Sequence, residues 1–71
     1  MNRYGTESVY EGTLRQARES LPALEQQLSE VDRLLQFHRE IGADTSADSA
    51  ELRRLKSQLD RIHRALEQRG F

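Results

Sequence analysis

The sequence predicts an all-α fold, an antiparallel helical hairpin of the coiled-coil type. Two runs of apolar residues carry this prediction, because each steps by threes and fours, the spacing that keeps side chains on one face of a helix. A short polar segment after Gly42 separates the runs and predicts the turn between them. We call these apolar residues the seam. Its first run is Leu14, Ala17, Leu21, Leu24, Leu28, Val31 and Leu35, and its second run is Leu52, Leu55, Leu59, Ile62 and Leu66.

The first helix is predicted to begin near residue 8. Residues 1–7 are polar and lack periodicity, which is typical of a flexible N-terminal tail. Ser8 and Glu11 then fit a capping box, in which the serine side chain accepts from the helix backbone and the glutamate reaches back to the serine. Residues 8–71 are therefore predicted to form a single helical domain.

Pro22 interrupts the predicted helix 8–41 and leaves two outcomes open. A proline in a helix interior cannot donate to the carbonyl of Arg18, and its ring crowds that turn. Either the helix kinks near residue 22 and continues, or Ser20 caps a new helix and the N-terminal stretch folds back into a small three-helix bundle. The apolar register is unbroken across the proline, which favours the kink.

The turn and the second helix follow from local signals. Gly42 is a good helix stop, because glycine adopts the left-handed conformation without penalty, and the predicted loop is 42–47. For the predicted helix 48–69, two capping pairs compete. Thr45 can cap with Asp48 three residues on, or Asp48 can cap with Glu51.

The second helix is shorter than the first, which predicts an overhang. Gly70 ends it, and Phe71 then occupies the position whose side chain folds back on Leu66. This helix spans about 30 Å, which covers the first helix from Ile41 back to about Ser20. Residues 8–20 are therefore predicted either to overhang with an exposed apolar stripe or to fold back as a third helix.

The charge is distributed unevenly, although the net charge is only −1. Residues 21–51 carry two Arg against seven acids, a net −5, and residues 52–71 carry six bases against two acids, a net +4. This asymmetry favours antiparallel pairing of the helices within one chain, and equally a charge-matched homodimer. The basic helix has no aromatic residue for stacking on bases, so nucleic-acid binding is not expected.

The composition argues against several functional classes. The chain has no cysteine, no signal peptide and no stretch near the roughly 20 apolar residues of a membrane span, so we expect a cytoplasmic protein. Its glycines are isolated, and His38 and His63 fall at opposite ends of the hairpin, so no phosphate loop, metal site or cofactor is predicted. A hairpin has no pocket to shift the pKa of a catalytic carboxyl group, and we expect no enzyme activity.

Three groups of residues are predicted interaction sites. Apolar residues beyond the needs of a two-helix seam are candidates for partner binding, or else for a third-helix core: Tyr4, Tyr10, Leu14, Phe37 and Phe71. Leu34 and Ile41 widen the apolar stripe around Phe37 near the loop, whereas Tyr4, Tyr10 and Phe71 are expected towards the other end of the hairpin. Acids crowd the predicted hairpin tip: Glu40, Asp44, Asp48 and Glu51. The second helix carries a basic face: Arg53, Arg54, Arg61 and Arg64.

The tip acids on a long hairpin resemble, in architecture and charge, the coiled-coil finger of transcript-cleavage factors and related regulators of bacterial RNA polymerase. This resemblance covers about residues 30–60 and implies a bacterial or phage transcription regulator that binds the polymerase through the acidic tip or the basic second helix. In size and architecture the chain is also similar to the small hairpin co-chaperones of type III secretion needle subunits.

Three functional hypotheses follow. The first is a non-enzymatic protein–protein interaction module, a small regulator, adaptor or co-chaperone that docks on a larger protein through its helix faces. The second is the regulator of RNA polymerase that the tip resembles. The third is a structural homodimer that forms a four-helix bundle.

Overall fold

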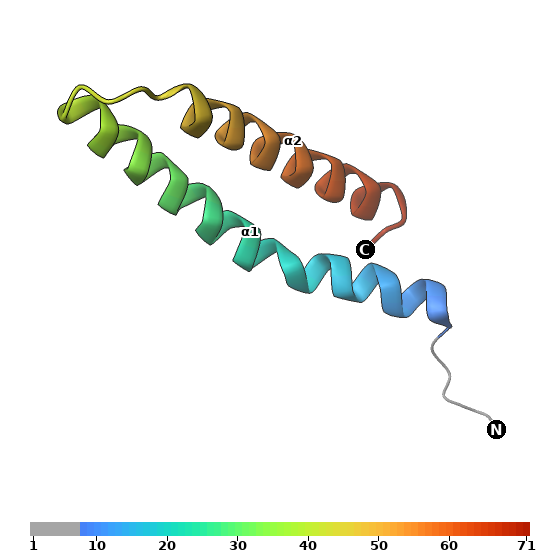
Figure 1. Ribbon diagram of the computed structural model, residues 1–71. Coiled ribbons are helices and arrows are strands. Elements are labelled where there is room, and N and C mark those ends of the chain that lie inside the picture. The colour runs from blue at the N-terminus through green and yellow to red at the C-terminus, as the bar shows by residue number, and fades with distance from the viewer. Residues whose placement is uncertain (1–7) are drawn as a thin grey trace.

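The chain forms a helical hairpin, as predicted. A computed structural model describes residues 8–71, in which two helices, α1 (Val9–Glu40) and α2 (Ser46–Gln68), pack antiparallel against each other (Figure 1). The hairpin is elongated, with principal extents of 61 × 19 × 14 Å. No strand occurs in the described part of the chain. Such a shape gives most residues a solvent-facing side, so the core is small.

The start of α1 is the predicted capping box. The Ser8 hydroxyl accepts from the backbone N–H of Glu11 at 3.1 Å, and the Glu11 carboxylate accepts from the backbone N–H of Ser8 at 3.3 Å. Two of the N–H groups that a helix start leaves without partners are satisfied in this way.

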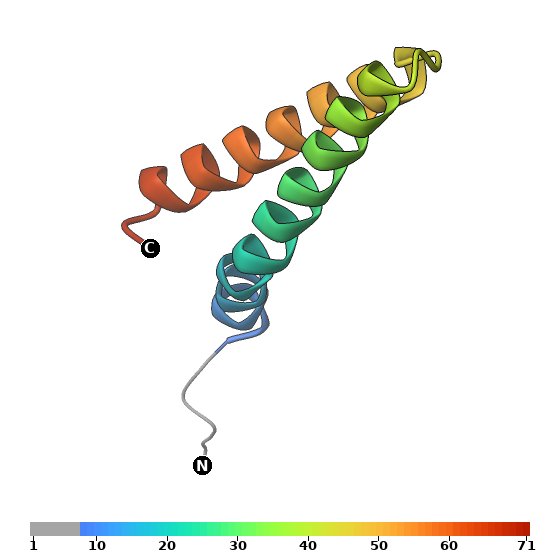
Figure 2. The same ribbon diagram turned by 90° about the vertical axis from the view of Figure 1, so that its left-hand side faces the viewer.

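The predicted three-helix bundle is not formed, because α1 continues through Pro22 as one helix of 32 residues. The Ser20 hydroxyl donates to the Ala17 carbonyl at 2.6 Å instead of capping a new helix. The loss of one hydrogen bond at Pro22 is outweighed by helical turns on both sides. The ribbon of α1 changes direction along its cyan part in both views (Figures 1 and 2), while a kink caused by the proline stays a prediction.

Both helices end in the glycine stop that the sequence predicts. Gly42 and Gly70 have φ angles of +76° and +71°, the left-handed region that glycine adopts readily. The N–H of Ala43 donates to the His38 carbonyl at 2.8 Å, and the N–H of Phe71 donates to the Leu66 carbonyl at 2.9 Å. These are the long hydrogen bonds of the Schellman motif, so both ends are fixed by the same local geometry.

The start of α2 differs from both predicted capping pairs. The helix begins at Ser46, and Thr45 occupies the N-cap position without a side-chain hydrogen bond. The cap role falls to Asp44, whose carboxylate accepts from the Ser46 backbone N–H at 3.2 Å and from the Ser46 hydroxyl at 2.8 Å. Asp48 lies inside the helix and is held by His38, so it is not available as a cap.

The core consists of four buried leucines: Leu35, Leu55, Leu59 and Leu66. Leu55 is the most deeply buried, at 1% exposure. The other seam leucines, together with Val31 and Ile62, are only half-buried. One layer of side chains between two helices therefore leaves the seam open on its flanks.

The overhang of α1 is present as predicted (Figure 1), and two polar contacts join it to the end of α2. α1 exceeds α2 by nine residues, about 13 Å of helix. Arg69 donates to the Tyr10 hydroxyl at 2.7 Å, and the Arg18 guanidinium donates to the Phe71 backbone oxygen. Leu14 is half-buried rather than free.

Candidate interaction surfaces

A stripe of exposed apolar side chains lies on α1 beside the turn. Leu34, Phe37 and Ile41 are 49%, 54% and 59% exposed. Steps of three and four residues place them on one face of the helix, next to the seam rather than within it. We call these three residues the loop-end stripe. Single exposed apolar residues are common, whereas three in register form a continuous patch, which is typical of a contact surface.

The loop-end stripe is presented on a fixed end of the hairpin. His38, beside Phe37, has its Nδ1 atom 2.5 Å from Oδ2 of Asp48 on α2, and the aspartate side chain is only 15% exposed. The rings of Phe37 and His38 lie 5.9 Å apart at a tilt of 49°. This cross-link between the two helices next to the turn limits how far the stripe can move relative to α2.

The remaining predicted partner-binding residues lie at the other end of the hairpin. Tyr10 is exposed and hydrogen-bonded to Arg69, whereas Leu14 is half-buried. Phe71 lies beside Leu66, as predicted, and both line a shallow groove that also contains Arg18, Leu21, His63 and Glu67. Tyr4 lies outside the described residues. The predicted set therefore forms two separate surfaces, one at each end of the hairpin.

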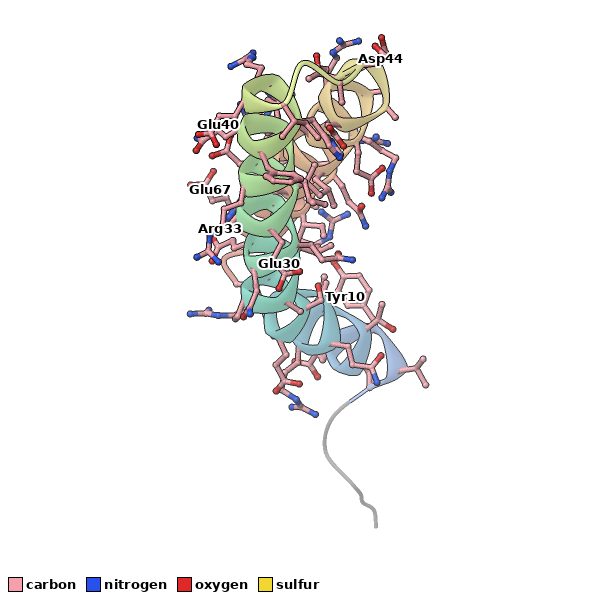
Figure 3. The ribbon with its side chains drawn as sticks, turned by 60° about the vertical axis from the view of Figure 1, so that its left-hand side comes forward. Tyr10, Glu30, Arg33, Glu40, Asp44 and Glu67 are labelled. Atoms are coloured by element: carbon pink, nitrogen blue, oxygen red, sulfur yellow. The ribbon has the colours of Figure 1, made fainter. Side chains whose placement is uncertain are left out.

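Three of the four predicted tip acids are held by neighbouring groups. Asp48 faces His38, and a hydrogen bond from the Ser46 hydroxyl lowers the pKa of the Asp44 carboxyl. A hydrogen bond from Arg54 lowers the pKa of the Glu51 carboxyl. Glu40 is exposed, on a different side of the hairpin from Asp44 (Figure 3). No group of three potential metal ligands occurs within residues 8–71.

The predicted basic face of α2 is exposed but partly neutralised. Arg54 donates to Glu51 through two nitrogens, at 3.0 and 2.6 Å, and Arg64 pairs with Asp60 at 2.8 Å. These are pairs within one helix, which contribute a few tenths of a kcal/mol each. A shallow groove on this helix is lined by Arg54, Gln58, Arg61 and Ile62.

The spacing of Leu34 and Ile41 around Phe37 predicted an apolar stripe near the loop, and all three side chains are exposed in the structure. The His38–Asp48 pair had no sequence signal, because it depends on the register that the turn gives the two helices.

The comparisons with known proteins give no relative for this chain, since no family model, no curated protein and no solved structure matches it. Within residues 8–71 neither helix is long and apolar enough to cross a membrane. The function has therefore to be argued from the surfaces alone.

Proposed function

We propose that this chain is a non-enzymatic protein–protein interaction module, a small regulator, adaptor or co-chaperone that docks on another protein through helix faces. The observation that carries the proposal is the loop-end stripe. Its three apolar side chains are each about half exposed, lie in register and are held on a fixed end of the hairpin.

The energetics of a small core support this proposal. Only four side chains of the described residues are buried and apolar, and chains of this size usually need a metal, disulfides or a partner for stability. The sequence contains no cysteine. Complete burial of a Leu, Ile or Phe side chain contributes about 1.5–3 kcal/mol, so covering the half-exposed stripe contributes about half of that for each residue. A docked protein would bury the apolar side chains that the small core of the hairpin leaves exposed.

The polymerase hypothesis has less support than docking through the stripe. It requires tip acids that are free to meet a metal ion or a basic surface, and Asp44, Asp48 and Glu51 already have partners. The homodimer hypothesis is favoured by a separate observation, the arrangement of charges on the two helices.

The test is a pull-down from a lysate of the source organism with the tagged full chain as bait. Phe37→Ser removes an exposed apolar side chain, so we expect the helical content to be unchanged and the bound protein to be lost. Leu34→Ser should act in the same way. Gln36→Ser, at an exposed position of the same helix that faces away from the stripe, is the matched control and should retain the bound protein. Equal recovery with all four baits would contradict docking through the stripe.

A further inference from the structure

The acids of α1 and the Arg and Lys residues of α2 do not pair with each other inside the described hairpin. From Glu19 to Asp32, α1 carries four carboxylates and no Arg or Lys, whereas from Leu52 to Arg64, α2 carries five bases and one acid. Yet within residues 8–71 no carboxylate of α1 forms an ion pair with an Arg or Lys of α2. The ion pairs of those bases lie within α2, and the one pair between helices joins His38 and Asp48. Much of this charge is therefore available to another chain.

Two contacts fix which residues of α1 and α2 lie at the same height along the hairpin. His38 lies beside Asp48, and Arg18 lies beside Phe71. Between these contacts α1 and α2 run level, so Glu30 lies at the height of Ser57 and Gln58. Since helical side chains lean toward the N-terminus of their own helix, the Arg61 side chain leans toward this same height.

The loop-end stripe and the groove on α2 lie on the same side of the hairpin. Glu30 and Leu34 are four residues apart and share a face of α1, while Arg54, Gln58 and Arg61 line the groove. Both helices are right-handed and run antiparallel, so the face of α1 with Glu30 and Leu34 and the face of α2 with Arg54 and Arg61 lie on the same side of the hairpin. The groove of Arg18, His63 and Glu67 lies on the opposite side. Figure 3 shows Glu30 in front, whereas Arg33 and Glu67 point to the left. We call the side with the stripe the open face.

We propose that the open face is covered by a second copy of this chain, related by a twofold axis parallel to the helices. This inference rests on the proposed function in that it takes the loop-end stripe as a docking surface. The axis sets α1 of each copy antiparallel to α2 of the other in a four-helix bundle, with both turns at one end. The stripe then packs on the first turns of the other α2, and Glu30 of each copy lies beside Arg61 of the other.

Charge selects this symmetry over the alternative one. A twofold axis perpendicular to the helices and in the plane of the open face would set α1 on α1 and α2 on α2. That arrangement sets the open-face carboxylates of one α1 against those of the other α1, and the open-face bases Arg54 and Arg61 of each α2 against those of the other α2. Like charges brought together across an interface are costly, whereas the parallel axis sets Glu30 of each copy beside Arg61 of the other.

Charge-swap variants of the full chain test the proposal. Glu30→Arg places Arg beside Arg twice in the dimer, and Arg61→Glu places Glu beside Glu twice. In sedimentation equilibrium at low salt, about 50 mM, we expect each variant alone to dimerise at least about tenfold more weakly than the unmodified chain. An equimolar mixture of the two should recover dimerisation, because both contacts of the mixed dimer again join opposite charges.

The controls carry the same charge changes outside the open face. Glu25→Arg and Arg53→Glu should leave dimerisation unchanged, and circular dichroism should show that all variants keep the helical content of the unmodified chain. A monomeric unmodified chain, a mixture that stays monomeric, or equal loss in the controls would overturn the proposal. If the chain is monomeric but Phe37→Ser still loses a bound protein in the pull-down, the second copy is refuted and docking through the stripe stands.

Discussion

At the scale of single residues, the hairpin depends on few side chains. Leu55, in the second seam run, is the most deeply buried side chain of the core. Leu34, directly before seam residue Leu35, is half exposed. Because stabilisation by an apolar side chain scales with the area removed from water, these two leucines should differ widely in their contributions to stability.

Leu55→Ala is therefore expected to unfold most of the chain. Truncating a buried leucine costs about 2–5 kcal/mol, which is a large part of the stability of a chain this small. The measurement is urea unfolding followed by circular dichroism at a fixed protein concentration. Leu34→Ala is the matched control and should cost less than half as much. Equal losses would show that the half-exposed face, rather than the seam, holds the fold.

The tip acids predict a pH dependence. Hydrogen bonding to Arg54 holds the pKa of Glu51 below its ordinary value of 4.5, so the folded state favours the ionised form. The resulting stability is present above the ordinary pKa and is lost as the pH falls through the lowered pKa. In an acid titration of helicity, Glu51→Gln should reduce the loss below about pH 4.5, while Glu40→Gln should follow the unmodified chain. Identical curves for all three would show that the pair contributes no stability.

The sequence was most informative about residues whose role is local. The Ser8–Glu11 box depends on neighbours three residues apart and was predicted correctly. Phe71 beside Leu66 was also predicted, since it follows from the glycine before it. The His38–Asp48 and Tyr10–Arg69 contacts were not predicted, because they require the relative height of two helices to within one turn.

At the scale of elements, the two helices are defined by their ends. Periodicity of the seam predicted both helices, and glycine predicted both stops. The sequence left two starts open for α2, after Thr45 or after Asp48, and the helix begins after Thr45 but without a side-chain hydrogen bond from it. Asp44, outside the helix, accepts from the backbone N–H of Ser46. Asp48 does not cap the helix, because its carboxylate contacts His38. Of the two outcomes that the sequence left open at Pro22, the third helix is not formed, because α1 continues through the proline as one helix.

The two kinds of glycine in this chain should respond oppositely to alanine. Gly42 has a φ angle of +76°, where an L side chain costs about 1–2 kcal/mol, so Gly42→Ala should destabilise the hairpin. Gly12 lies inside α1, where alanine is more favourable than glycine by about 1 kcal/mol, so Gly12→Ala should stabilise it. Thermal unfolding of both variants is the test. A stabilising Gly42→Ala would contradict the Schellman stop.

At the scale of the whole molecule, the hairpin is an incomplete unit. It is 61 Å long, its core is one layer of leucines, and the open face carries the loop-end stripe beside the groove of Arg54 and Arg61. The sequence predicted an excess of apolar residues near the loop and a second group towards the other end. The structure has Phe37 at the turn and Tyr10 and Phe71 at the opposite end, because the antiparallel hairpin brings the end of α2 back beside the first half of α1.

The central claim is that another polypeptide covers the open face, and the molar mass of the chain in solution tests it most directly. Light scattering over a hundredfold range of concentration should give twice the 8.2 kDa of one chain at the upper end, with dissociation on dilution. A folded chain that stays at 8.2 kDa over the whole range, with an unfolding midpoint independent of concentration, would contradict a second copy as the cover of this face.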